Sequence, residues 1–472
     1  MKLDNLTIES AHRGLMKKEF SAVELAKFYL NKIKKENKKL NAFLEITEKL
    51  ALEQAKKVDN KIKHREKIGG IEGIPIAIKD NILVEGHKCT AGSKILENYT
   101  ATYDATVIKK LKQAGAVILG KTNLDEFGMG SSTENSAFGP TKNPIDITRV
   151  PGGSSGGSTA AVAADQCIAA LGSDTASSIR QPAALCGVVG FKPTYGMVSR
   201  YGLIAMTSSL DQIGPIAKTV EDAKLIFDII KGRDEMDSTS VEHIKHQIKS
   251  NIYKNFKIGI PKEYFGESTD KEVGEIINKA IKNYEKIGAK IIEVSLPLTD
   301  YALSVYHIVM PAEVSTNLAR YDGIKYGLRK QAKNLLEQYL TTRANGFGNE
   351  ARRRIILGAY ILSAGYKDAY YNKAKKIRLL IEKEFKNIFK EVDVLMTPTA
   401  PTPAFKIGEK QDPLVMYLSD IYTAPANIGN VPAISIPCGK VGNLPIGLQI
   451  IGPQFYDELV FETAQIYGQL SE

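Results

Sequence analysis

Cysteine is scarce in this chain of 472 residues, which has only Cys89, Cys167, Cys186 and Cys438 and no CxxC pair. Thiols so far apart exclude a disulfide framework and a cysteine-rich zinc site, and they predict buried, reduced side chains. The chain also lacks any apolar run near the roughly 18 residues that a membrane helix needs. Its first residues, MKLDNLTIES, have no apolar core for a signal peptide. These absences predict a cytoplasmic protein that makes no contact with a membrane.

What the chain does contain is typical of a globular protein with a large core. Hydrophobic residues make up 43% and charged residues 25%, with only 19 prolines. The net charge of +10 would favour an anionic partner such as RNA. However, many lysines lie in runs such as KIKKENKKL (32–40), which are typical of a solvated helix face, and no aromatic and basic RNA motif accompanies them. RNA binding is therefore the function that the sequence supports least.

Short apolar runs bounded by Gly or Pro alternate with amphipathic stretches along the whole chain, which predicts an α/β protein with a mixed central sheet surrounded by helices. The runs expected to form buried strands are 74–79, 116–120, 167–172, 257–261, 290–294, 392–396, 433–437 and 446–452. Helices are expected near 21–33, where Ser21 and Glu24 fit a capping box, and at 220–232 and 371–392. No repeat or linker divides the chain. We expect one domain, 1–472, in which 230–390 is a mainly helical elaboration.

One motif suggests a nucleotide site. GAVILGKT (115–122) matches the phosphate-loop pattern G-x-x-x-x-G-K-[ST]. In a phosphate loop the strand precedes the first glycine, and the variable residues turn so that their amides face the phosphate. Here the variable residues Ala-Val-Ile-Leu are strand formers. The segment is therefore predicted to be a strand and not a nucleotide site.

A second unusual segment, PGGSSGGS (151–158), has the composition of a linker but runs directly into a dense series of small residues. Twenty-four residues after Ser154 a second cluster contains Ser173, Ser177 and Ser178. Glycines beside a serine expose its hydroxyl and bring amide groups towards an oxyanion. The two clusters would then face one another across a site, although a pair of surface turns explains their composition equally well.

A nucleophilic serine needs a base. None of the six histidines lies beside either cluster in the sequence. Lys79 ends the predicted strand 74–79, where burial would lower its pKa and make it a proton acceptor. Spacing alone does not choose between Ser177 and Ser178 as the nucleophile.

Four segments carry a resemblance to a known family. GIPIAIKDN (73–81), the segment 120–144, VPGGSSGGS (150–158) and the segment 171–196 resemble, in this order, the amidase signature family. The resemblance continues through 209–223 and 431–453 and so covers nearly the whole chain. Within the family, the segments 312–327, 346–371 and 412–435 are most similar to the A subunits of tRNA-dependent amidotransferases.

The resemblance implies a Ser-Ser-Lys triad for amide hydrolysis. On the matching positions Lys79 is the base, Ser154 is the bridging serine, preceded by a cis peptide bond, and Ser178 is the nucleophile. The backbone amides implied to hold the oxyanion are those of Thr175, Ala176, Ser177 and Ser178. Ala176 and Ser177 replace the usual Gly-Gly of the family, and they would be strained if the site required positive φ there.

The closer resemblance also implies a glutamine pocket. Asp420 would bind the α-ammonium, Arg354 the α-carboxylate and Tyr306 would donate a further hydrogen bond. Because Arg352, Arg353 and Arg354 are adjacent, the arginine assignment has an uncertainty of one position.

The implied function is the glutaminase subunit of a tRNA-dependent amidotransferase, which supplies ammonia to convert misacylated Glu-tRNA(Gln), or Asp-tRNA(Asn), to the amide form. The implied partners resemble the B and C subunits, with tRNA bound mainly through B. No metal or other cofactor is implied in this chain, and ATP and magnesium are expected in the partner. The alternative is a stand-alone amidase acting on small amides.

Overall fold

The computed structural model describes residues 3–242, 256–266 and 268–470. One mixed sheet of eleven strands runs through these residues, in the order β1-β3-β2-β4-β6-β5-β10-β11-β9-β7-β8. The strands are β1 Phe43–Ile46, β2 Pro75–Lys79, β3 Val117–Thr122, β4 Ala169–Asp174, β5 Val189–Lys192, β6 Gln212–Ala217, β7 Lys257–Pro261, β8 Lys290–Val294, β9 Val394–Pro398, β10 Ala433–Val441 and β11 Leu444–Ile451. The prediction of an α/β protein with a mixed central sheet is confirmed.

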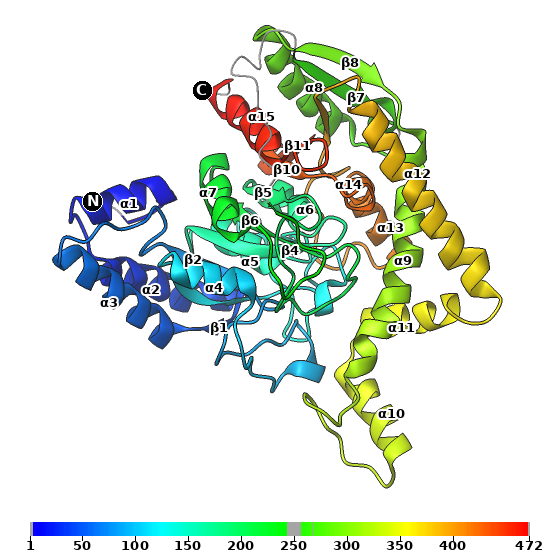
Figure 1. The fold of residues 1–472 in the computed structure, drawn as a ribbon, viewed down its shortest axis with the longest axis horizontal. Helices are drawn as coiled ribbons and strands as arrows, with labels where there is room; N and C mark the ends of the chain where they lie inside the picture. The colour runs from blue at the N-terminus through cyan, green and yellow to red at the C-terminus, as the bar shows by residue number, and fades with distance from the viewer. Residues whose placement is uncertain (1–2, 243–255, 267, 471–472) are drawn as a thin grey trace.

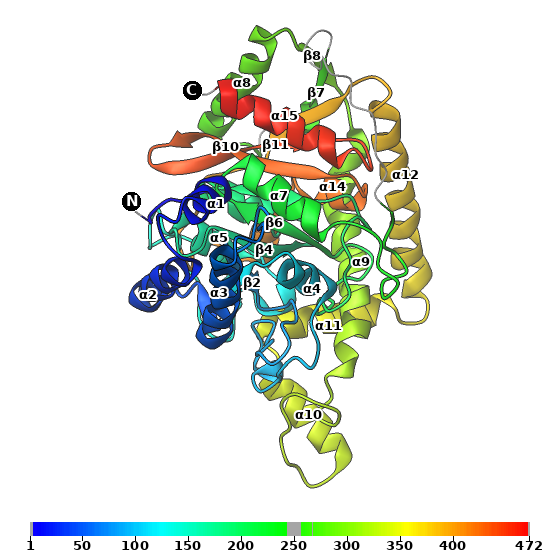
Figure 2. The same cartoon turned by 60° about the vertical axis from the view of Figure 1, so that its left-hand side comes forward.

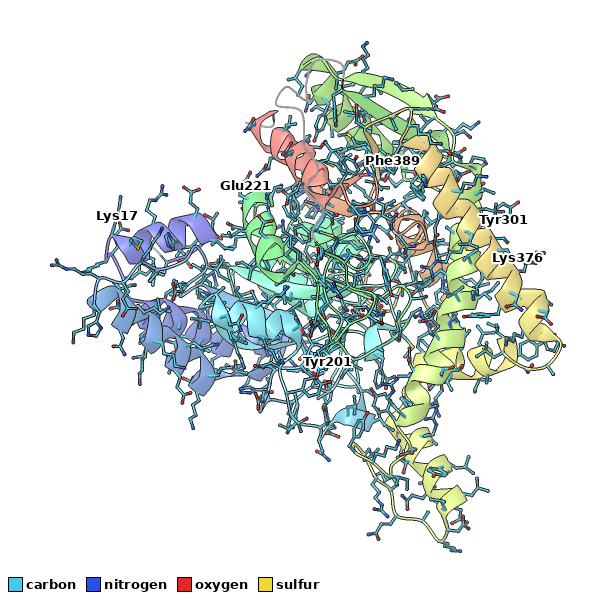
Figure 3. The ribbon with its side chains drawn as sticks, in the orientation of Figure 1. Lys17, Tyr201, Glu221, Tyr301, Lys376 and Phe389 are labelled. Atoms are coloured by element: carbon cyan, nitrogen blue, oxygen red, sulfur yellow. The ribbon has the colours of Figure 1, made fainter. Side chains whose placement is uncertain are left out.

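Helices surround this sheet (Figure 1). They are α1 Ile8–Met16, α2 Ala22–Leu40, α3 Glu48–Lys63, α4 Thr106–Gln113, α5 Gly156–Ala163, α6 Arg180–Cys186, α7 Val220–Ile230, α8 Lys271–Lys286, α9 Ala302–Asn317, α10 Leu335–Gly346, α11 Asn349–Ile361, α12 Lys373–Ile388, α13 Pro413–Tyr417, α14 Ala424–Ile428 and α15 Asp457–Leu470. The helices α9, α11 and α12 form a layer at one side, and α10 projects away from the sheet in both views (Figures 1 and 2). The labelled Tyr301 and Lys376 lie on the outer side of this layer (Figure 3).

All eight apolar runs that were predicted to be strands form strands. Each residue of β2 and β4 is buried, as expected for runs without polar alternation inside a sheet. The capping box of α2 is also present, with the Glu24 amide donating to Ser21 Oγ and the Ser21 amide donating to Glu24 Oε2. Besides α8 to α12, the segment 230–390 contains β7 and β8, which are one edge of the sheet.

The phosphate-loop match forms a strand, as predicted. β3 begins at Val117, inside the motif, and continues to Thr122. Lys121 is fully buried, and its Nζ donates to Asp80 Oδ1 at 2.9 Å and to the carbonyl of Lys88 at 2.9 Å. This lysine is therefore part of the core and pairs with a carboxylate of the same chain.

The scarce cysteines are unpaired. Cys89, Cys167 and Cys186 are buried and Cys438 is half-buried. Across the described ranges, no helix has the length and apolar character to cross a membrane. The lysines of 32–40 are mostly exposed along α2, as predicted for a solvated face.

Candidate active site

Lys79 is the last residue of β2, which lies between β3 and β4 in the sheet. Because β2 pairs in parallel with β4, with Ile78 opposite Leu171, the ends of the two strands meet and bring Lys79 to Ser173. Lys79 Nζ lies 2.7 Å from Ser154 Oγ, 2.8 Å from Ser155 Oγ and 3.0 Å from Ser173 Oγ. The two serine clusters, distant in the sequence, therefore meet at one buried amine and are not the pair of surface turns that their composition also allowed.

The environment of Lys79 favours its neutral form. Its side chain is fully buried, and burial lowers its pKa to about 7, although the charges of Asp125, Asp174 and Asp211 act in the opposite direction. No carboxylate forms an ion pair with this amine in the described part of the chain. Lys79 thus combines contact with a serine hydroxyl and a pKa near neutrality, the two properties that a general base requires.

The Gly-Ser stretch is part of the core and not a linker, since every residue from Pro151 to Ser158 is buried. The peptide bond between Gly153 and Ser154 is cis, as the family resemblance implies. A Cβ atom at Gly153 would lie 2.3 Å from Asp125 Oδ2 and 2.7 Å from the Ser132 amide nitrogen. Only glycine fits here, so the close approach of the backbone fixes Ser154 in place.

The loop that carries the predicted nucleophile is held by a buried ion pair. Arg180, fully buried at the start of α6, donates through Nε and Nη2 to the Asp174 carboxylate, both at 3.1 Å. Thr175 Oγ1 donates to Asp211 Oδ1 at 2.8 Å, and the Ser155 amide donates to the Ser178 carbonyl at 3.1 Å. These contacts anchor both ends of the loop and join it to the Gly-Ser stretch.

The amide groups of residues 175–178 donate no hydrogen bond to any described residue, and neither does the Ser178 hydroxyl. Four free donors beside a free hydroxyl form an arrangement that can bind a developing oxyanion. Ala176 and Ser177 are not among the residues with positive φ. The replacement of the usual Gly-Gly therefore introduces no backbone strain at these two positions.

The three residues predicted to bind substrate come from three different elements. Tyr306 lies on α9, Arg354 on α11, and Asp420 ends the 3₁₀ helix η7 (Leu418–Asp420). All three are buried. The nearby charge of Arg354 acts on the pKa of both other residues, so the structure brings the trio together.

Of the three adjacent arginines, only Arg354 is buried. Its Nε donates to Glu350 Oε1 at 2.7 Å, and its guanidinium lies over the ring of Tyr417, 5.4 Å from the centroid. Arg352 and Arg353 are exposed. Burial thus distinguishes Arg354 from its two neighbours, a distinction that spacing did not provide.

One carboxylate oxygen of Asp420 accepts a hydrogen bond and the other has no hydrogen-bond partner. Ser131 Oγ donates to Oδ2 at 2.8 Å, whereas Oδ1 is buried without a partner. The Ser177 hydroxyl is also buried without a hydrogen-bond partner, and it lies near enough to Asp420 to act on the pKa of that carboxyl. Burial raises the pKa of Asp420 to about 6. A buried polar atom without a hydrogen-bond partner destabilises the folded protein. Asp420 Oδ1 and Ser177 Oγ therefore mark a position where a polar group of a ligand would be stabilised.

Several residues of this site were given no role in the sequence analysis. Ser155 and Ser173 contact Lys79 directly, and Asp174 and Arg180 hold the loop. Ser155 adjoins Ser154 in the Gly-Ser stretch, and Arg180 follows the second cluster by two residues, so proximity was the available signal. Within the described residues, no group of three or more His, Cys, Asp or Glu side chains is arranged to hold a metal ion.

Comparison with known proteins identifies relatives along the whole chain. The Amidase family profile matches residues 24–461. The A subunit of glutamyl-tRNA(Gln) amidotransferase from Gloeothece citriformis is 55% identical, over 99% of this chain and 98% of that protein. The A subunit of the same enzyme from Caldanaerobacter subterraneus subsp. tengcongensis is 54% identical, over 99% of this chain and 96% of that protein.

Solved structures show the same relationship. The crystal structure of the glutamyl-tRNA(Gln) amidotransferase A subunit from Thermotoga maritima is 46% identical, with a TM-score of 0.81 over 98% of this chain and 94% of that one. The peptide amidase from Stenotrophomonas maltophilia is 28% identical, with a TM-score of 0.84 over 98% of this chain and 96% of that one. The resemblance predicted from the motifs is therefore confirmed, and the chain belongs to the amidase family.

Proposed function

We propose that this chain is the glutamine-hydrolysing subunit of a tRNA-dependent amidotransferase. The observation that carries the proposal is the Lys79 amine, buried in contact with Ser154 and with a pKa near 7, beside a loop whose serine and amides are free. The similarity over full length to A subunits of such amidotransferases supports the choice of glutamine as the amide.

In the proposed reaction, neutral Lys79 takes a proton from Ser154 while Ser154 takes the proton of Ser178. The Ser178 oxygen forms a bond to the side-chain carbonyl carbon of glutamine. Amides of Thr175, Ala176, Ser177 and Ser178 would stabilise the oxyanion. The C–N bond then breaks, Ser154 returns a proton to the departing ammonia, and water hydrolyses the glutamyl ester.

The hydrogen bonds favour Ser154 over Ser155 as the bridging residue. Ser155 Oγ donates to the carbonyl of Ser173 at 3.0 Å, so its hydrogen is committed and it accepts from Lys79. Neutral lysine has two N–H donors and one lone pair. When the donors point to Ser155 and Ser173, the lone pair is left for the Ser154 hydroxyl.

For substrate binding we propose that Asp420 holds the α-ammonium of glutamine at its unpaired Oδ1, and that Arg354 and Tyr306 bind the α-carboxylate and a further polar group. An ammonium beside Asp420 would satisfy the buried oxygen and favour the ionised carboxylate.

We further propose that the chain works in the cytoplasm, as one domain over 1–472, with partners that resemble the B and C subunits. The partner would bind misacylated Glu-tRNA(Gln), or Asp-tRNA(Asn), mainly through the component resembling B, and would use ATP and magnesium. This chain itself would need no metal or other cofactor, since every step above uses its own side chains and amides.

The test is ammonia release from L-glutamine by the complex purified from its native host, compared with the Ser178→Ala complex. The proposal predicts that only wild type releases ammonia, and faster when ATP and Glu-tRNA are present. If the complex ignored glutamine and cleaved small amides, the stand-alone amidase would be the correct function. Retained glutamine turnover by Ser178→Ala would remove Ser178 as the nucleophile.

A further inference from the structure

One buried carboxylate outside the proposed reaction lies between two parts of the site. Glu126 begins the 3₁₀ turn η2 (Glu126–Gly128), which follows β3, and its side chain is almost completely buried. The Ser93 hydroxyl donates to Oε1, and the Gly348 amide donates to Oε2 at 2.8 Å. Ser93 Oγ also reaches the carbonyl of Gly346 at 3.2 Å. Glu126 therefore holds the segment that connects α10 to α11.

Gly348 is the N-cap residue that precedes α11, and it has no side chain with which to cap the helix. Glu126, 222 positions earlier in the chain, supplies a carboxylate to this end instead. A negative group at a helix N-terminus also interacts favourably with the helix dipole. The fit is close, because a Cβ atom at Gly348 would lie 2.6 Å from Glu126 Oε2.

The same turn also lies beside Ser154 of the predicted triad. Gly128 has φ of 83°, and a Cβ atom there would lie 3.5 Å from Ser154 Oγ. Phe127 lies between Glu126 and Gly128 in the chain, and its ring packs against the ring of Phe347, with the two centroids 5.8 Å apart. Three consecutive residues thus lie beside Ser154 at one end and contact the start of α11 at the other.

Helix α11 carries Arg354 six positions after Gly348, which corresponds to about 9 Å along a helix. A helix moves as a rigid element, so a displacement at Gly348 would also displace the Arg354 guanidinium. Even a small displacement of a binding group lowers the affinity for the ligand, because polar contacts with a ligand depend strongly on position.

We propose that Glu126 is a positioning residue that fixes α11, and with it Arg354, relative to Ser154, and so sets the affinity for the substrate carboxylate. The inference rests on the proposed glutaminase function. Glu126 does not touch the triad and takes no part in proton transfer.

The test uses the whole complex and steady-state glutamine hydrolysis. Glu126→Ala should raise KM for glutamine roughly tenfold while kcat changes less than about threefold. Glu97→Gln is the matched control, because Glu97 is exposed at the end of the neighbouring turn Lys94–Leu96 and should behave as wild type. Glu126→Gln should restore most of the affinity. Its oxygen can accept from Gly348 and its amide can donate to Ser93, and burial already raises the pKa of Glu126 to about 7.

Gly348→Ala provides a second perturbation if Glu126→Ala does not fold. Gly348 has φ of −71°, which alanine adopts without strain, so the added methyl acts only by displacing the Glu126 carboxylate. It should raise KM in the same way. An unchanged KM in a folded Glu126→Ala or Gly348→Ala complex, or an equal loss of kcat, would overturn the inference. Failure of the proposed function is distinct, since wild type itself would then not hydrolyse glutamine.

Discussion

The pH dependence of glutamine hydrolysis tests the role of Lys79 quantitatively. Burial lowers the pKa of this amine to about 7, and only its neutral form can accept the Ser154 proton. With that pKa, the neutral fraction rises from about one tenth at pH 6 to about nine tenths at pH 8. From Lys79 alone, the predicted kcat/KM therefore rises about tenfold between these values and is nearly constant above pH 8.

A lysine with an ordinary pKa would give a different curve. Its neutral fraction would still rise tenfold for each pH unit at pH 8, with no plateau below about pH 10. The assay is ammonia release by the complex from pH 6 to 9.5, at glutamine concentrations far below KM, where the rate reports on the free enzyme. Because the pKa of Asp420 is about 6, a second series from pH 5 to 6 should show kcat/KM falling more steeply than ionisation of Lys79 alone predicts.

The matched variant is Lys79→Arg, which keeps a positive charge and cannot lose it near neutral pH. It should be inactive at every pH while remaining folded by circular dichroism. Two results would refute the assignment of Lys79 as the base. One is a kcat/KM that still rises about tenfold per pH unit up to pH 9.5, and the other is a Lys79→Arg complex whose activity is within a few-fold of wild type.

Two further predictions concern the substrate pocket and the loop. Asp420→Asn should raise KM for glutamine at least tenfold at pH 8, with a smaller effect on kcat, because a neutral amide cannot replace the ion pair with the α-ammonium; equal KM values in a titration of initial rates would exclude this contact. Ala176→Gly should lower the free energy of unfolding by about 0.4–1 kcal/mol without raising kcat, since φ at this position already suits alanine. A gain in turnover, measured beside urea unfolding, would show that the loop needs glycine.

Much of the fold was predictable because its strands are short, continuous apolar runs. Eight of these were identified, whereas β6 was missed because Gly214 and Pro215 interrupt its apolar pattern. β5 and β1 were missed because each has only four residues. Strand order was not predictable, since it depends on pairings between segments far apart in the sequence.

The same limit applies to the site. The family motifs implied Lys79, Ser154 and Ser178, but the contacts of Ser155 and Ser173 with Lys79 depend on the pairing of β2 with β4. Arg354 could not be separated from Arg353 by spacing, because only the packing of α11 against α9 decides which arginine is buried. Glu126 had no signal in the sequence, because its partner Gly348 is 222 positions away.

The chemistry proposed for Ser178 is best tested by identifying which residue becomes acylated during turnover. The complex would be mixed with glutamine, quenched in acid at steady state, digested and analysed by mass spectrometry. We expect a glutamyl ester on Ser178 in wild type and no ester in Lys79→Arg. An ester on Ser154 or Ser177, or ammonia release from glutamine with no acylated serine in the quenched enzyme, would contradict the proposed mechanism.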